Sequence, residues 1–140
     1  MIYFHCPDFY NGFEIYQGIN ILKHEAANCF NDDVQIGSIF GTFPSMIWNG
    51  GTFDLGRLVT DLRDIEYIAD MYQGMGFPIN FTFTNGLLID TDCFDRYCNK
   101  ILDIFNNRGN GILVNSECLE KYLREKYPNY RILKSITSTE

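Results

Sequence analysis

The sequence contains neither a long apolar segment nor an excess of basic residues. No run approaches the roughly 20 apolar residues that a transmembrane helix needs. Only 11 Lys and Arg residues stand against 18 Asp and Glu residues, so the formal net charge is −7. Because nucleic-acid binding rests largely on basic side chains that contact phosphates, this balance argues against a nucleic-acid partner. We therefore expect neither a membrane nor a nucleic acid as a partner.

The five cysteines lack the spacings that are typical of disulfide frameworks and metal sites. Their odd number excludes a complete set of internal disulfides, no Cys-x-x-Cys pair occurs, and Cys93 and Cys98 are five residues apart. The first residues also lack the basic region and long apolar core of a secretion signal. We predict free thiols, a cytoplasmic location, and no metal or cofactor site made by this chain alone.

Residues 1–140 have the size and apolar content of a single domain, in which strand patterns alternate with helical patterns. Strand patterns occupy residues 1–6, 34–40, 79–84, 111–114 and 131–136. Helical spacing of apolar residues occupies residues 13–30, 61–75, 90–107 and 117–126. In the first of these helices the apolar residues with helical spacing are Ile15, Ile19, Leu22 and Ala26. In the third they are Phe94, Tyr97, Cys98, Ile101 and Phe105.

This alternation predicts an α/β fold with parallel strands and helical crossovers. Two architectures fit the pattern. One is an open five-stranded sheet of the doubly wound type. The other is half of a TIM-type (β/α)₈ barrel, which normally needs about 250 residues. The periodicity does not choose between them.

In both architectures, ligands bind at the carboxyl ends of the strands. His5, near the end of the first strand pattern, and Asp8, just after it, are the candidate catalytic residues. An imidazole can act as a general base, and a nearby carboxylate can fix its tautomer. The alternative is that His5 is a structural histidine in the core or a loop. No nucleophile motif accompanies the pair.

The candidate ligand-binding residues come from the same predicted edge. They are polar or aromatic side chains after the second to fifth strand patterns: Thr42, Trp48, Asn49, Thr84, Asn85, Asn115, Ser116 and Thr137. Trp48, the only tryptophan, is suited either to stacking on a ligand or to packing over the end of the sheet. For the Asn and Ser residues the alternative is turn formation and helix capping.

Four segments resemble the collagenase-like peptidase family. They are GFPINFTFTN at 76–85, GNGILVN at 109–115, LEKYLREKYP at 119–128 and ILKSITST at 132–139. The resemblance, which covers roughly Leu62 to Thr139, implies a TIM-type barrel. Members of that family are peptidases, or hydroxylate RNA bases or a quinone precursor with an iron–sulfur cluster. The cysteines that hold the cluster lie in a later segment, and none of the five cysteines here matches them, so no cofactor is carried over.

We therefore predict a barrel-like domain that binds a small polar or peptide-like ligand at the carboxyl ends of its strands. An unclosed barrel exposes two edge strands, which favours either a homodimer or a C-terminal half that completes the sheet. The alternative is a non-catalytic protein-binding or adaptor module that uses an apolar loop over Phe43–Phe53.

Overall fold

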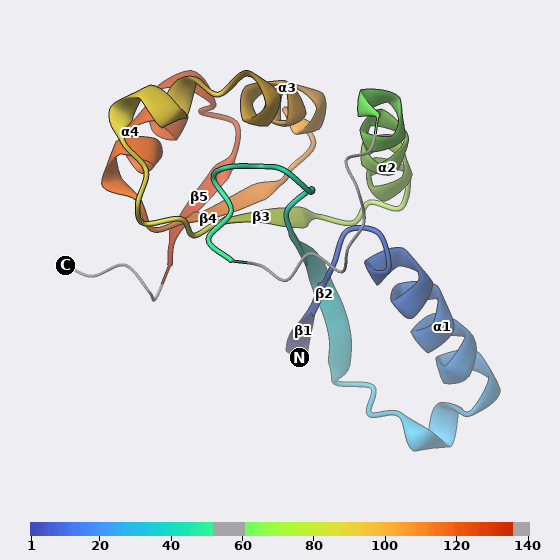
Figure 1. Ribbon diagram of the computed structural model, residues 1–140. Helices are drawn as coiled ribbons and strands as arrows, with labels where there is room; N and C mark the ends of the chain where they lie inside the picture. The colour runs from blue at the N-terminus through green and yellow to red at the C-terminus, as the bar shows by residue number, and fades with distance from the viewer. Residues whose placement is uncertain (52–60, 136–140) are drawn as a thin grey trace.

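The computed structural model describes residues 1–51 and 61–135. These residues form an α/β fold around one parallel sheet with the strand order β1-β2-β3-β4-β5 (Figure 1). The strands are β1 (Ile2–Pro7), β2 (Val34–Gly41), β3 (Ile79–Phe83), β4 (Gly111–Val114) and β5 (Arg131–Lys134). The helices are α1 (Gly12–Glu25), α2 (Leu62–Gly74), α3 (Arg96–Phe105) and α4 (Glu117–Lys126), with 3₁₀ turns η1 (Ala27–Cys29) and η2 (Asp90–Phe94). The predicted fold class is confirmed.

All four helices cover the same face of the sheet. In Figure 1, α2, α3 and α4 lie on one side of it. The α1 residue Gly12 packs against Ile39, which points to the same face as Ile79 and Phe81. A doubly wound sheet has a point at which the strand order reverses, and this order has none. The sheet is open, and its connectivity is that of consecutive units of a barrel.

Local sequence explains where the helices begin. The side chains of Asp61, Asp95 and Ser116 accept hydrogen bonds from the backbone amides of Arg63, Cys98 and Leu119. Such bonds satisfy amides that have no partner within the first turn of a helix. Gly76 and Gly109 follow α2 and α3 with positive φ angles of 65° and 73°, a conformation that glycine adopts without strain.

The hydrophobic core lies between the sheet and the helices and is centred on Phe81. This side chain is fully buried on β3, where its Cα pairs with Gly41 and Ile112. Its ring contacts those of Phe9, which follows β1, and Phe105 on α3, at centroid distances of 5.4 and 5.3 Å. Edge-to-face rings of this kind add to the stability that area burial alone gives.

Two predicted helical patterns are wrong in detail. The helix expected over 90–107 begins only at Arg96, because Asp95 is extended (φ −53°, ψ 124°) and serves as its N-cap. Phe94 therefore lies outside α3 and is 70% exposed. The helix expected over 13–30 ends at Glu25, and Ile15 and Leu22 of its apolar stripe are exposed. Ile19 is half-buried and faces β2, so only part of the apolar stripe of α1 faces the sheet.

The segment after β2 runs into the core. Phe43, Met46 and Trp48 are buried, and the Trp48 ring packs edge-to-face against Phe83 at 5.2 Å. The Trp48 Nε1–H donates to the Asp92 carbonyl over 2.8 Å. Of the two roles considered for Trp48, the structure shows packing. Phe53, at the end of the predicted apolar loop, lies outside the described residues.

We predict that Trp48→Ala lowers the free energy of unfolding by about 3–5 kcal/mol, because it opens a cavity and leaves a buried carbonyl without its donor. The measurement is urea denaturation followed by circular dichroism. Ile47→Ala is the matched control: this neighbour is 42% exposed, so its loss should cost about 0.5 kcal/mol or less. Equal effects of the two substitutions would contradict the burial of Trp48.

Candidate functional site

Asp8 lies in the turn that joins β1 to α1 and does not pair with His5. Its Oδ1 accepts hydrogen bonds from the Tyr10 and Asn11 amides, and its Oδ2 accepts one from the Asn11 side chain. Its backbone has a positive φ of 76°, which Asp tolerates better than most residues. The carboxylate therefore shapes this turn, and the predicted base-and-orienter pair is not formed in the structure.

At the end of β3, polar groups fasten the segment after β2 to the sheet. The Asn85 amide donates to the Trp48 carbonyl over 3.2 Å, and Asn85 Nδ2 donates to the Ile47 carbonyl over 2.8 Å. Asn85 Oδ1 accepts from the Leu87 amide over 3.0 Å. A Cβ on Gly50 would lie 2.2 Å from the Thr84 carbonyl group, so only glycine fits there. Trp48, Thr84 and Asn85 therefore lie together where the segment after β2 is attached to the end of β3.

The other candidates at this edge have separate positions. Asn115 follows β4, and its side chain lies 3.7 Å from the position of a Cβ built on Gly86. Ser116 caps α4, as the capping alternative proposed. Thr42 and Asn49 are half-buried. Thr137 lies outside the described residues.

A row of polar side chains crosses the sheet on the face opposite the helices. His5 on β1, Ser38 on β2, Asn80 on β3 and Arg131 on β5 form it. His5 Nδ1 lies 2.6 Å from Ser38 Oγ, which accepts a hydrogen bond from Asn80 Nδ2 over 2.8 Å. Arg131 Nη2 donates to Asn80 Oδ1 over 3.4 Å. We refer to these four residues as the polar row.

Two glycines make room for the polar row. Phe4 on β1 pairs with Ile36 on β2, but the next residue, His5, pairs with Ser38. Gly37 is therefore an extra residue in β2, a β-bulge, and it places Ser38 beside His5. On β4, a Cβ at Gly111 would lie 2.3 Å from Asn80 Oδ1. Glycine at position 111 thus lets the Asn80 and Arg131 side chains meet above β4.

Sequence reasoning selected His5 but missed its three partners in the polar row. One signal was present in β3, where Asn80 and Thr82 alternate with three buried apolar residues. That alternation assigns one polar face to a strand near the middle of the sheet. Which other residues share the face depends on the strand register and on the bulge at Gly37, and neither can be inferred from one sequence.

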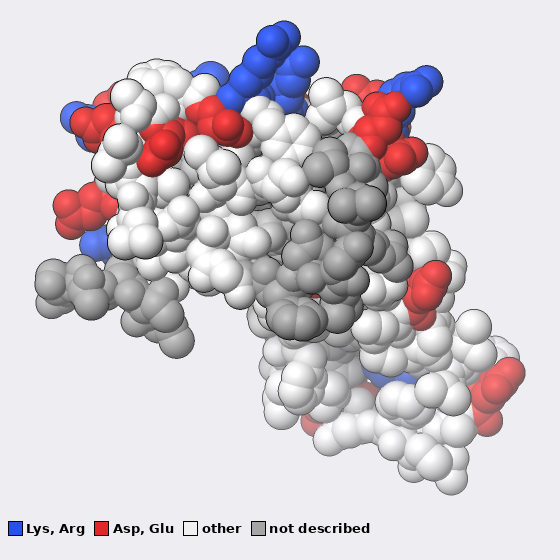
Figure 2. Space-filling view, viewed as in Figure 1, with Lys and Arg blue, Asp and Glu red and all other residues white. Residues whose placement is uncertain are grey.

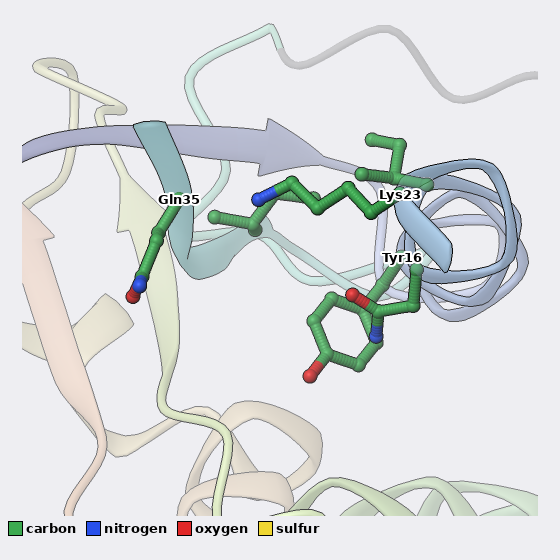
Figure 3. A pocket seen from close by; sticks show the side chains of 6 residues that line it. Tyr16, Lys23 and Gln35 are labelled. Carbon is green, nitrogen blue, oxygen red and sulfur yellow. The ribbon is translucent and has the colours of Figure 1, made fainter. Parts of the chain in front are cut away.

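A small cleft lies between α1 and β2 (Figure 3). Its volume is about 190 Å³, and its lining is Tyr16, Ile19, Asn20, Lys23, Gln35 and Ile36. Lys23 reaches from the helix to the strand, where its Nζ donates to the Val34 carbonyl over 2.9 Å. This cleft is smaller than the roughly 300–1,000 Å³ of pockets for drug-sized ligands. Its one cationic group is already bonded to the backbone.

The buried thiols are in poorly reactive surroundings. Burial raises the pKa of Cys98 to about 12. Burial, with the neighbouring Cys118, raises the pKa of Cys93 to about 11. A raised pKa lowers the thiolate fraction on which nucleophilic and metal-binding reactivity depend. Among residues 1–51 and 61–135, no three His, Cys, Asp or Glu side chains are grouped to hold a metal ion.

Comparison of the chain with protein-family models, curated proteins and solved structures finds no match. Within the described ranges, no helix has the length and apolar character that crossing a membrane requires. The functional argument therefore rests on the fold and on the geometry of its polar groups.

We predict that the native chain reacts with iodoacetamide first at Cys29, whose side chain is exposed. Cys93 and Cys98 should react at least about a hundredfold more slowly, because burial and a raised pKa both suppress the thiolate. Mass mapping of labelled peptides at mildly alkaline pH measures the rates. Chemically denatured chain is the control, in which all five thiols should react at similar rates. Comparable labelling of Cys98 and Cys29 in native protein would contradict the described packing.

Proposed function

We propose that the chain is a barrel-type βα domain, related to the collagenase-like peptidases, that binds a small polar or peptide-like ligand at its sheet. The observation that supports this best is the strand order β1-β2-β3-β4-β5 with every helix on one face. Consecutive order with one-sided crossovers is how a (β/α) barrel is built. It leaves the opposite face of this open sheet without a covering helix, where a polar ligand can bind.

The β1 edge of this sheet is suited to contact another chain. Met1, Ile2, Tyr3 and Phe4 are each more than half exposed, and β1 contains no Lys, Arg, Asp or Glu. Edge strands that avoid association normally carry charges, bulges or a covering segment. The exposed apolar residues of α1, the helix that follows β1 in the chain, are Ile15, Ile21 and Leu22. We call the seven residues the β1–α1 surface.

We propose that a second copy of the chain covers the β1–α1 surface. Each of its side chains is 44–66% exposed. With a full area of roughly 150–250 Å² for a large side chain, the exposed parts of the seven residues amount to about 600–1,000 Å² in total. A standard stable interface buries about 800 Å² on each partner. Figure 2 shows charged side chains gathered over α2, α3 and α4, whereas the part formed by α1, β1 and β2 is mostly uncharged on the side shown.

The alternative function is a protein-binding module that uses the same surface for a different protein. The same exposed residues favour it. The loop over Phe43–Phe53 is not the binding surface that we predicted, because its described aromatic residues Phe43 and Trp48 are buried. We also propose a cytoplasmic location, since all five cysteines are free.

Native mass spectrometry of the purified chain tests the proposal. We expect a dimer, and a mass increment wherever a small ligand remains bound. Phe4→Lys places a charge in the β1–α1 surface and should weaken dimerisation at least about tenfold, because burying that charge is costly.

Tyr67→Lys is the matched control, since Tyr67 lies on α2 and is 72% exposed. It should leave the dimer unchanged. A monomeric native chain at micromolar concentration would overturn the second-copy proposal and favour the protein-binding module.

A further inference from the structure

We infer that the polar row binds the oxyanion group, a carboxylate or a phosphate, of a small molecule. This inference rests on the proposed function, in that the sheet binds a polar ligand, and it names the ligand's chemical class. It moves the site from the carboxyl ends of the strands to the face that the helices leave uncovered. It does not require the second copy, because all four residues belong to one chain.

The hydrogen bonds of the polar row run in one direction and leave donors free at both ends. Arg131 donates to Asn80, and Asn80 donates to Ser38. The Ser38 hydroxyl accepts from Asn80, and we assign its one proton to His5 Nδ1, which requires the imidazole tautomer that is protonated at Nε2. In neutral His5 the remaining proton lies on Nε2, which no described residue accepts. The uncovered face thus presents the His5 Nε2–H and the remaining Arg131 N–H groups.

The guanidinium of Arg131 has no carboxylate partner among the described residues. The three ion pairs found there are Asp61–Arg63, Asp70–Arg108 and Glu120–Arg124. The contact that Arg131 makes within the polar row is with the neutral Asn80 amide. A guanidinium presents several N–H donors in a geometry that matches carboxylate and phosphate oxygens. In a chain of net charge −7, an Arg that faces neutral groups is suited to bind an external anion.

The row is rigid at its centre and accessible at its ends. Ser38 is 2% exposed and is held from both sides, whereas His5 and Arg131 are exposed. Phe40, which pairs with Asn80, and Leu113, two residues beyond Gly111 on β4, are half-buried on the same face. They offer apolar contact beside the donors. The ligand that fits is therefore a small molecule with one oxyanion group attached to an apolar part.

Titration of the native chain with inorganic phosphate, and separately with acetate, tests the site by the shifts of backbone amide resonances in NMR spectra. We expect saturable shifts centred on residues 5, 38, 80 and 131 for at least one probe. Arg131→Gln should weaken that binding at least about tenfold through loss of charge-assisted hydrogen bonds. Lys134→Gln is the matched control: it removes the same charge from β5 on the opposite face and should change the affinity about twofold or less.

Gly111→Ala tests the geometry of the row without removing any polar group. The added methyl would displace Asn80 Oδ1, so it should also weaken binding while circular dichroism confirms that the variant is folded. Absence of saturable shifts with both probes, or binding that Arg131→Gln leaves unchanged, would overturn the inference. Repeating the titration on Phe4→Lys separates it from the assembly: binding by that variant supports the polar row even where the dimer is lost.

Discussion

Burial of the Phe81 ring is the interaction on which the rest of the structure depends. Phe81 lies on the middle strand, and its ring contacts Phe9, Phe43, Phe83, Phe105 and Tyr130 at centroid distances between 5.3 and 6.5 Å. These rings come from the segments after β1 and β2, from β3, from α3 and from the turn before β5. Because helices and loops share this one cluster, the part of the helix side around Phe81 is filled with side chains and has no room for a ligand.

The opposite face is free for chemistry because the crossovers all cover one side. A consecutive strand order is stable only if the second face is itself tolerant of water or covered by further structure. Here the face carries His5, Asn80 and Arg131, with Ser38 buried among them. Polar side chains that satisfy one another keep such a face soluble while holding their outermost donors in fixed positions.

The sequence predicts the strands and the capping residues better than it predicts which helix faces are buried. β3 and α4 were predicted from alternation and from Ser116, because these signals are local. The start of α3 depends on the extended backbone of Asp95, which separates Phe94 from the helix it was assigned to. The exposure of Ile15 and Leu22 follows from how α1 sits on the sheet, and the polar row follows from the register at Gly37. Periodicity shows which residues are apolar, but not what lies opposite them.

At the carboxyl ends of the strands, side chains predicted to bind a ligand instead hold turns and loops in place. Asp8 and Asn85 have the chemistry of ligand-binding residues, yet the Asp8 oxygens accept hydrogen bonds within the turn into α1. Asn85 Nδ2 donates to the segment after β2, and its Oδ1 accepts from Leu87 in the segment after β3. A side chain whose donors and acceptors are committed to backbone groups must break those bonds to bind a ligand, and breaking them releases the loop as well. The side-chain hydrogen bonds of His5 and Arg131 go to residues on neighbouring strands and hold no turn or loop in place. The donors that we propose to bind an oxyanion, on His5 and Arg131, therefore lie on the sheet face and not at the carboxyl ends of the strands.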